Sequence, residues 1–200
     1  GTGGRTGSVT CIEGVNLSAC STVSAGGSGA VNITGNGGSG TVFNRGVYVN
    51  GAGSAIESTS GAITINGTAG GTVSLNRGIE LGYADVNTGG NITLTGTAPA
   101  GASGVFNTGV YLLGLPTTAI DAGGTLTITG NGGGGSSFNE GVRVTGGALN
   151  GTLNLNGTAL PGTTGVWNSG VYLLNVNAAT GSITGTGGGG TGFNHGVYAV

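Results

Sequence analysis

The residues that could perform acid–base or nucleophilic chemistry are few in this chain of 200 residues. There is one histidine, His195, and there are six carboxylates. Glu57, Asp85 and Asp121 follow one another at intervals of 28 and 36 residues, so a repeating fold could bring them together. Carboxylates clustered on one face can hydrolyse glycosidic bonds. The remaining carboxylates are Glu13, Glu80 and Glu140.

We expect no catalytic site and no cofactor, and we expect that the chain is not an enzyme. A catalytic histidine needs partners held in a preformed pocket, and we interpret His195 as a solvated surface residue. The glycine runs "GNGGGG" and "GTGGGG" lack the following Gly-Lys-Ser/Thr of a phosphate loop. A carbohydrate-active enzyme that uses Asp85 or Asp121 remains the weakest alternative.

The two cysteines, Cys11 and Cys20, lie nine residues apart. No second pair and no further histidine accompany them, so we expect no zinc site and no other metal site. A local Cys11–Cys20 disulfide would fit an oxidising, extracellular compartment. The alternative is a pair of free thiols that act as small core residues.

The composition is dominated by glycine, with 51 residues, and carries only four Arg, no Lys and a net charge of −2. This charge gives no electrostatic reason to bind nucleic acid or an anionic membrane. No segment approaches the roughly 18 consecutive apolar residues of a membrane helix. The chain begins with Gly and shows no signal peptide, which suggests a processed chain or a segment of a longer one.

A seven-residue motif recurs along the whole chain. "FNRGVYV" at 43 returns as "FNTGVYL" at 106, "FNEGVRV" at 138, "WNSGVYL" at 167 and "FNHGVYA" at 193, with weaker copies at 75 and 11. The motif glycines are 26 to 32 residues apart. A second series runs in phase ("VNITG", "ITING", "ITLTG", "LTITG", "LNLNG", "SITGTG"), and a weaker third series lies between them ("SAIES", "YADVN", "TAIDA").

These segments alternate apolar and polar residues and are rich in β-branched residues, which indicates strands. Short regular strands could form a sandwich or a barrel. Duplication of the whole unit in phase instead favours stacked coils, in which each repeat buries its apolar side chains against its neighbours. We predict an all-β parallel β-helix (β-solenoid) with 26–32 residues per coil and six to seven coils. Residues 1–200 form a single domain, with a degenerate first coil at 1–25 and regular coils at 26–200.

Stacking of the motifs places equivalent residues in columns that run along the solenoid. We expect the aromatic column to fill the interior, the Asn column to form an amide ladder and the Gly column to make the bend. We expect the variable residue before the Gly to point outward, as does a second column at the Tyr position. The aromatic column is Phe43, Leu75, Phe106, Phe138, Trp167 and Phe193; the Asn column is Asn44, Asn76, Asn107, Asn139, Asn168 and Asn194. The Tyr column is Tyr48, Glu80, Tyr111, Arg143, Tyr172 and Tyr198.

The outward positions of the second series form a candidate binding face, because all are Thr or Asn. They should make a flat array of two files, with about 6.8 Å along each strand and about 4.8 Å between coils. Such files resemble the water-ordering face of solenoid ice-binding proteins. Alternatively, they stabilise stacked parallel strands without binding anything. The pairs are Asn32 and Thr34, Thr64 and Asn66, Thr93 and Thr95, Thr127 and Thr129, Asn154 and Asn156, and Thr184 and Thr186.

From about residue 26 onward, the repeated "LTITGNGG" and "FNxGVYL" units resemble the repeat regions of filamentous-haemagglutinin-like adhesins and other large bacterial exoproteins. The resemblance implies a right-handed parallel β-helix in a secreted or cell-surface protein, where it serves as a structural shaft. It implies an extracellular location, and the charge and the lack of a long apolar segment predict no nucleic acid and no membrane insertion. The expected partners are neighbouring repeats or further copies stacked end to end, with a cell-surface glycan as a further candidate.

An assembly expectation follows from the last repeat. The chain stops inside "FNHGVYAV" without a visible cap, and open sheet edges recruit other strands. We therefore expect the last coil to be covered by a further coil in the working protein. A module that binds ice or glycan through the Thr and Asn positions remains the alternative function.

Overall fold

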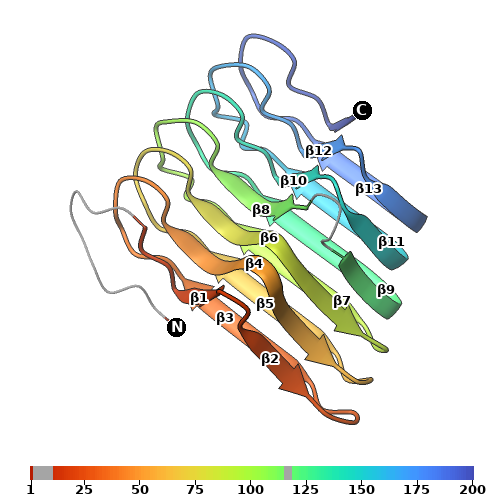
Figure 1. The fold of residues 1–200 in the computed structure, drawn as a ribbon. Coiled ribbons are helices and arrows are strands. Elements are labelled where there is room, and N and C mark those ends of the chain that lie inside the picture. The colour runs from red at the N-terminus through yellow and green to blue at the C-terminus, as the bar shows by residue number, and fades with distance from the viewer. Residues whose placement is uncertain (2–10, 115–118) are drawn as a thin grey trace.

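The computed structural model describes residue 1, residues 11–114 and residues 119–200. These residues form an all-β parallel solenoid of about five turns, and no helix occurs among them. The repeat predicts six to seven coils, which is more than five because that number includes the incomplete coils at the two ends. Figure 1 shows the coils stacked in chain order, from β1 at one end to β12 and β13 at the other. Within the described ranges, no helix is long and apolar enough to cross a membrane.

Each coil contributes strands to three faces, and every described strand pair is parallel. The motif face consists of β1 (Val15–Ser18), the first parts of β4 (Arg45–Ser58) and β6 (Arg77–Thr88), β8 (Thr108–Leu113), β10 (Val142–Thr145), β12 (Val171–Leu174) and β14 (Val197–Ala199). The Thr/Asn face consists of β3 (Val31–Asn36), β5 (Ile63–Thr68), β7 (Ile92–Thr97) and the later parts of β9 (Ala119–Asn131), β11 (Ala148–Thr158) and β13 (Asn177–Thr186). The third face consists of β2 (Thr22–Ala25), the later parts of β4 and β6, and the first parts of β9, β11 and β13.

The core lies between these faces and is built from columns of branched aliphatic side chains. Within β3, Val31 and Ile33 are buried, whereas Asn32 and Thr34, which follow them, are exposed. The same alternation in each coil removes the apolar side of every strand from water, which is the main stabilising contribution to a solenoid. The register confirms the three series, including the weak third one, where Ile56 pairs with Val86 and Val86 with Ile120.

The motif glycines do not make the bend, contrary to the expectation from sequence, because none of them has a positive φ angle. They stand instead where the motif face and the Thr/Asn face touch. A Cβ atom on Gly67 would lie 2.1 Å from the carbonyl oxygen of Gly78, and the equivalent distances in the other coils are 1.8 to 2.1 Å. Only glycine allows two backbones this close. The pairs are Gly35–Gly46, Gly67–Gly78, Gly96–Gly109, Gly130–Gly141, Gly157–Gly170 and Gly185–Gly196.

At this corner the positive φ angles belong to the aromatic column, with Phe106 at 59° and Trp167 at 61°. The expectation that this column fills the interior is therefore wrong. A left-handed backbone at this corner turns the ring outward and the following Asn inward, so the rings are half-buried, and Phe193 in the last coil is exposed. Left-handed conformations cost roughly 1–2 kcal/mol for such residues. Stacking between Phe106 and Phe138, with centroids 4.8 Å apart, offsets part of this cost.

The Asn column forms the expected ladder inside the corner. Asn44, Asn76, Asn107, Asn139 and Asn168 have no exposed surface. Asn139 shows the pattern: its backbone N–H and its side-chain Nδ2 both donate to Oδ1 of Asn168, at 3.1 and 3.2 Å. The ladder reaches the last coil, where the backbone N–H of Asn168 donates to Oδ1 of Asn194 at 2.8 Å. Buried amides that bond in this way fix the vertical register of the corner.

Candidate functional site

The Thr/Asn face is wider than the sequence suggested, with three files of outward polar side chains instead of two. The strands run one residue beyond the quoted "VNITG" and "ITLTG" segments, which adds a third file. The alternation in "NITGN" and "TINGT" already carried this signal. The first file is Asn32, Thr64, Thr93, Thr127, Asn154 and Ser182; the second is Thr34, Asn66, Thr95, Thr129, Asn156 and Thr184; the third is Asn36, Thr68, Thr97, Asn131, Thr158 and Thr186.

The last coil differs from the expected alignment. Thr184 and Thr186 pair with Asn156 and Thr158, so they occupy the second and third files, and Ser182 takes the first. The expectation assigned them one file too early because the last coil is the shortest, and spacing alone does not show where its residues are lost. Ser182 joins its file through a hydrogen bond from Oγ to Oδ1 of Asn154, at 3.1 Å. Every member of the three files is half-buried or exposed.

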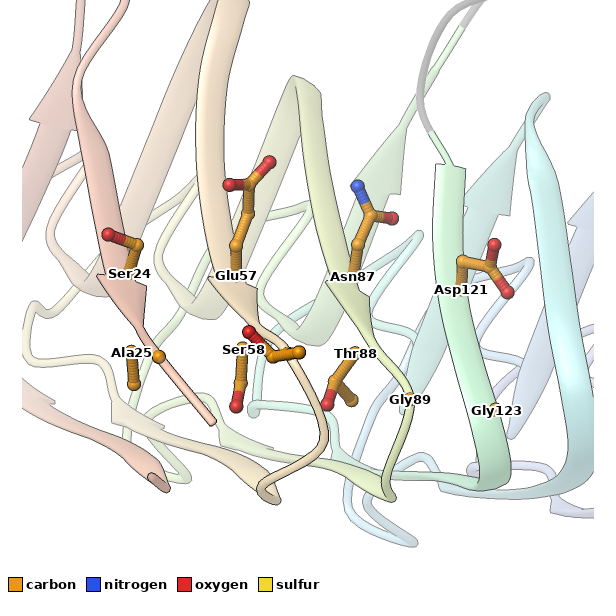
Figure 2. A pocket seen from close by; sticks show the side chains of 11 residues that line it. Ser24, Ala25, Glu57, Ser58, Asn87, Thr88, Gly89, Asp121 and Gly123 are labelled. Carbon is orange, nitrogen blue, oxygen red and sulfur yellow. The ribbon is translucent and has the colours of Figure 1, made fainter. Parts of the chain in front are cut away.

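A polar groove of about 650 Å³ runs along the third face where its strands turn toward the Thr/Asn face. Figure 2 shows Ser24, Glu57, Asn87 and Asp121 side by side on successive strands, with their side chains pointing the same way. Register explains this row, because Glu57 pairs with Asn87 and Asn87 with Asp121. Ser58, the residue after Glu57, points to the opposite side of its strand. Its hydroxyl donates a hydrogen bond to the carbonyl oxygen of Gly29 at 2.7 Å.

The structure brings Glu57 and Asp121 into one row but does not bring the three carboxylates into one cluster. The coil that holds Asn87 separates them, which places their backbones about 9.6 Å apart at two coil spacings. Asp85 is engaged elsewhere, since its Oδ1 accepts the backbone N–H of Ala119 at 3.0 Å. Among the described residues, no three His, Cys, Asp or Glu side chains lie close enough to hold a metal ion. The groove therefore offers a row of solvated hydrogen-bonding groups.

The variable residue before the motif glycine is buried in four coils and half-buried in the other three, although the sequence suggested a solvated position. Arg45 is 8% exposed, Thr108 is 1% exposed, and Glu140 and Ser169 have no exposed surface. The reason is that the flanking aromatic and Tyr columns close over it. The guanidinium carbon of Arg45, for example, lies 4.3 Å from the ring centroid of Tyr48 and 5.4 Å from that of Phe43. We call this set, Glu13, Arg45, Arg77, Thr108, Glu140, Ser169 and His195, the covered column.

Charges in and beside the covered column are paired. Arg45 contacts Glu13 at 3.0 Å and also donates to Glu80, and Arg77 contacts Glu80 at 2.6 Å. Burial is the largest single influence and opposes the charge on Arg45, but Glu80, Tyr48 and Glu13 together outweigh it and raise the pKa of Arg45 above its ordinary value. Such pairs require good geometry, because removing charges from water is costly.

Glu140 is the most perturbed carboxyl group of the described chain. Burial raises its pKa to about 7, although Arg143 at 2.7 Å and the hydroxyl of Thr108 at 3.2 Å favour the charged form. This group therefore takes up a proton near neutral pH.

His195, at the end of the covered column, is half-buried and stacks on Tyr198 with centroids 5.2 Å apart. Trp167 and Phe193 stack beside it at 4.9 Å. The histidine is thus part of an aromatic cluster, where the sequence suggested a solvated site.

The expected disulfide is not formed, because Cys11 and Cys20 are both free and exposed. The extended strand β1 runs between them and keeps them apart. The thiol of Cys20 lies 3.3 Å from the carbonyl oxygen of Ala52 in the next coil.

Comparison with known proteins gave no match: no family model, no curated protein and no solved structure resembles the chain closely enough to identify it.

Proposed function

We propose that this chain is part of the structural shaft of an extracellular adhesin or filament. The observation that carries the proposal is the continuity of the ladders from coil to coil. Backbone pairing, the Asn amides and the facing glycines all repeat in register, so the solenoid can extend along its axis without any new type of contact. Such a rod has many nearest-neighbour interfaces and a uniform surface, which suits a spacer.

The outer edge of the last coil exposes apolar side chains. Phe193, Val197 and Val200 are 61%, 42% and 65% exposed, whereas the equivalent Val171 is fully buried under its neighbour. A further coil of the same repeat would cover these side chains and pair with the edge of β14 (Val197–Ala199). Another copy stacked head to tail supplies such a coil, and contacts of this kind build filaments.

Sedimentation velocity and negative-stain electron microscopy of the 200-residue chain test this proposal. Particles should lengthen with protein concentration at constant width. Val197→Lys places a charge on the exposed edge and should prevent the lengthening. Val73→Lys is the matched control, because Val73 is also 37% exposed but lies away from the last coil. A chain that stays monomeric at high concentration, or that assembles equally well with Val197→Lys, would refute the proposal.

A second candidate function is binding through the Thr/Asn face, and the three files favour it. Their hydroxyls and amides form an uncharged lattice with about 4.8 Å between coils and about 6.8 Å along each strand. Such a lattice could order water against ice or contact a glycan. Thermal hysteresis that is lost in Thr95→Lys, in the middle of the face, would support this function over a shaft alone.

A further inference from the structure

The Thr/Asn face differs from the other two faces in charge. The chain has ten charged residues, of which Arg5 lies outside the described ranges. Of the other nine, six belong to the covered column or the Tyr column of the motif face, and Glu57, Asp85 and Asp121 lie on the third face. Every member of the three files on the Thr/Asn face is Thr, Asn or Ser. Two such faces can therefore meet without charge repulsion and without burying an unpaired charge.

The face is also regular along the whole stack. Its strands pair in the order β3, β5, β7, β9, β11 and β13, and Figure 1 shows them side by side. The register shifts of β11 against β9 and β13 fall between Leu149 and Thr152, before the face begins. Similar side chains thus stand above one another at about 4.8 Å, as they do in the sheets of a steric zipper, where the rows of one sheet fit between the rows of another.

The side chains of the face are already well ordered for a contact. Thr is β-branched and has few rotamers, and Thr95 and Thr129 in the middle of the face are half-buried. Each Thr offers a methyl group for packing and a hydroxyl for a hydrogen bond. Neighbouring members also bond to each other, since Oγ of Ser182 lies 3.1 Å from Oδ1 of Asn154. Docking onto this surface therefore costs little side-chain entropy.

The size of the face is that of a small specific interface. Each strand contributes about six residues to the face, as β3, β5 and β7 do. At about 3.3 Å per residue and about 4.8 Å between strands, the flat area is roughly 500 Å² on each copy. Two copies would bury about 1,000 Å² in total, which is near the lower limit for a specific interface. We therefore expect a weak pair that forms at high protein concentration.

We propose that two copies of this chain pair face to face through their Thr/Asn faces. The files of one copy lie in the furrows between the files of the other, and the hydroxyls and amides exchange hydrogen bonds across the contact. A second copy suits this face because its rows have the same spacing, so they stay in step over all the strands. The contact uses the same patch on both copies, so it closes as a two-fold dimer. Thr95 and Thr129, in the middle file, lie nearest the two-fold axis.

This pairing does not require the end-to-end contacts of the proposed shaft. Where a shaft does form, every stacked copy adds the same area, so two shafts side by side should hold together more tightly than two single copies. The two kinds of contact also differ in outcome. End-to-end contact lengthens a particle without limit, whereas the face-to-face contact doubles its width once.

Sedimentation velocity and equilibrium from micromolar to millimolar concentration test the pairing, and Val197→Lys removes end-to-end growth. The Val197→Lys chain should still pass from one copy to two. Adding Thr95→Lys should raise the Kd of this dimer at least tenfold, because the two new ammonium groups approach each other near the two-fold axis. Adding Ser24→Lys is the matched control, since it places the same charge at an exposed position of the third face and should leave the Kd unchanged.

Thr95→Val keeps the shape of the side chain and should retain the dimer, and circular dichroism checks that every variant is folded. The pairing is overturned if the Val197→Lys chain stays monomeric at millimolar concentration, or if Ser24→Lys weakens the dimer as much as Thr95→Lys. A monomer that shows thermal hysteresis or binds a neutral glycan through this face would overturn it and assign the face to that ligand. A dimer that never lengthens in the unsubstituted chain would support the pairing and refute the shaft.

Discussion

A single methyl group at Gly96 should strongly destabilise the solenoid. In Gly96→Ala the new Cβ atom would lie 2.1 Å from the carbonyl oxygen of Gly109 and 2.7 Å from Cγ2 of Val110. Ordinary contacts of a Cβ atom begin at 3.4 Å, so the first distance is too short by about 1.3 Å. The Thr/Asn face and the motif face must separate locally to accommodate the substitution.

The magnitude follows from what the methyl group meets. The closest atoms belong to the backbone, which is held by parallel pairing on both sides and cannot rotate away. Separation would also loosen Leu94 and Val110, which have no exposed surface. Overpacking of a core costs roughly 1–3 kcal/mol, and the rigid surroundings favour the upper end, about 3 kcal/mol. For a domain of this size, each kcal/mol lowers the melting temperature by about 2–4 °C, which predicts a fall of about 6–12 °C.

Thermal and urea unfolding followed by far-ultraviolet circular dichroism measure this effect. Gly162→Ala is the matched control, because no atom lies within 4 Å of its Cβ position and its φ angle is not in the left-handed region. Alanine there restricts the unfolded chain and should stabilise the protein by about 0.4–1 kcal/mol. If Gly96→Ala unfolds at the same temperature as Gly162→Ala, the two glycine columns are not in contact and the reasoning is refuted.

Three further predictions concern the protonation of Glu140, the hydrogen bonds of Asn139 and the two free cysteines. Protonated Glu140 is favoured in the folded chain, with a pKa of about 7 against an ordinary 4.5. The contribution of this group to stability should therefore be fully present below pH 4.5, fall by about 3 kcal/mol as the pH rises to 7, and then level off. Glu140→Gln should flatten this part of the urea-unfolding profile, and an unchanged pH slope would contradict the assignment. Asn139→Ala removes the acceptor of the Asn107 backbone N–H and should cost about 3 kcal/mol in urea unfolding, whereas Asn66→Ala on the exposed face should change stability by less than about 0.5 kcal/mol. Both thiols, at Cys11 and Cys20, should react with a thiol reagent without denaturant, and a non-reducing mass that shows a disulfide would contradict the free cysteines.

Much of the fold was readable from the sequence because stacking repeats any local pattern. The alternation in "VNITG" and "LTITG" gave strands, and their recurrence in phase with "FNRGVYV" gave parallel coils. The Asn ladder followed from the same register, since equal positions in successive coils must be neighbours. The resemblance to adhesin repeats implied the same solenoid, but no matched family supports the adhesin itself.

The direction of side chains at the corners could not be read in this way. Phe106 was expected inside and Gly109 at the bend, yet Phe106 takes the left-handed conformation and Gly109 stays in the strand. Single-residue backbone conformations at a corner depend on which side chains the neighbouring coils can accommodate. Here, buried Asn107 and the contact between glycine backbones outweigh the usual preference for glycine at positive φ.

The candidate sites depended even more on tertiary structure. The sequence determined that Glu57 and Asp121 lie in the third series, that Thr and Asn fill the outward positions of the second, and that a variable residue precedes each motif glycine. Only the packed coils decided that Asn87 separates the two carboxylates, that the Thr/Asn face has three files, and that the variable residue is covered. The physical reason is that periodicity specifies only which residues share a column. Burial depends on how long side chains of adjacent columns pack over one another, as Tyr48 and Phe43 do around Arg45.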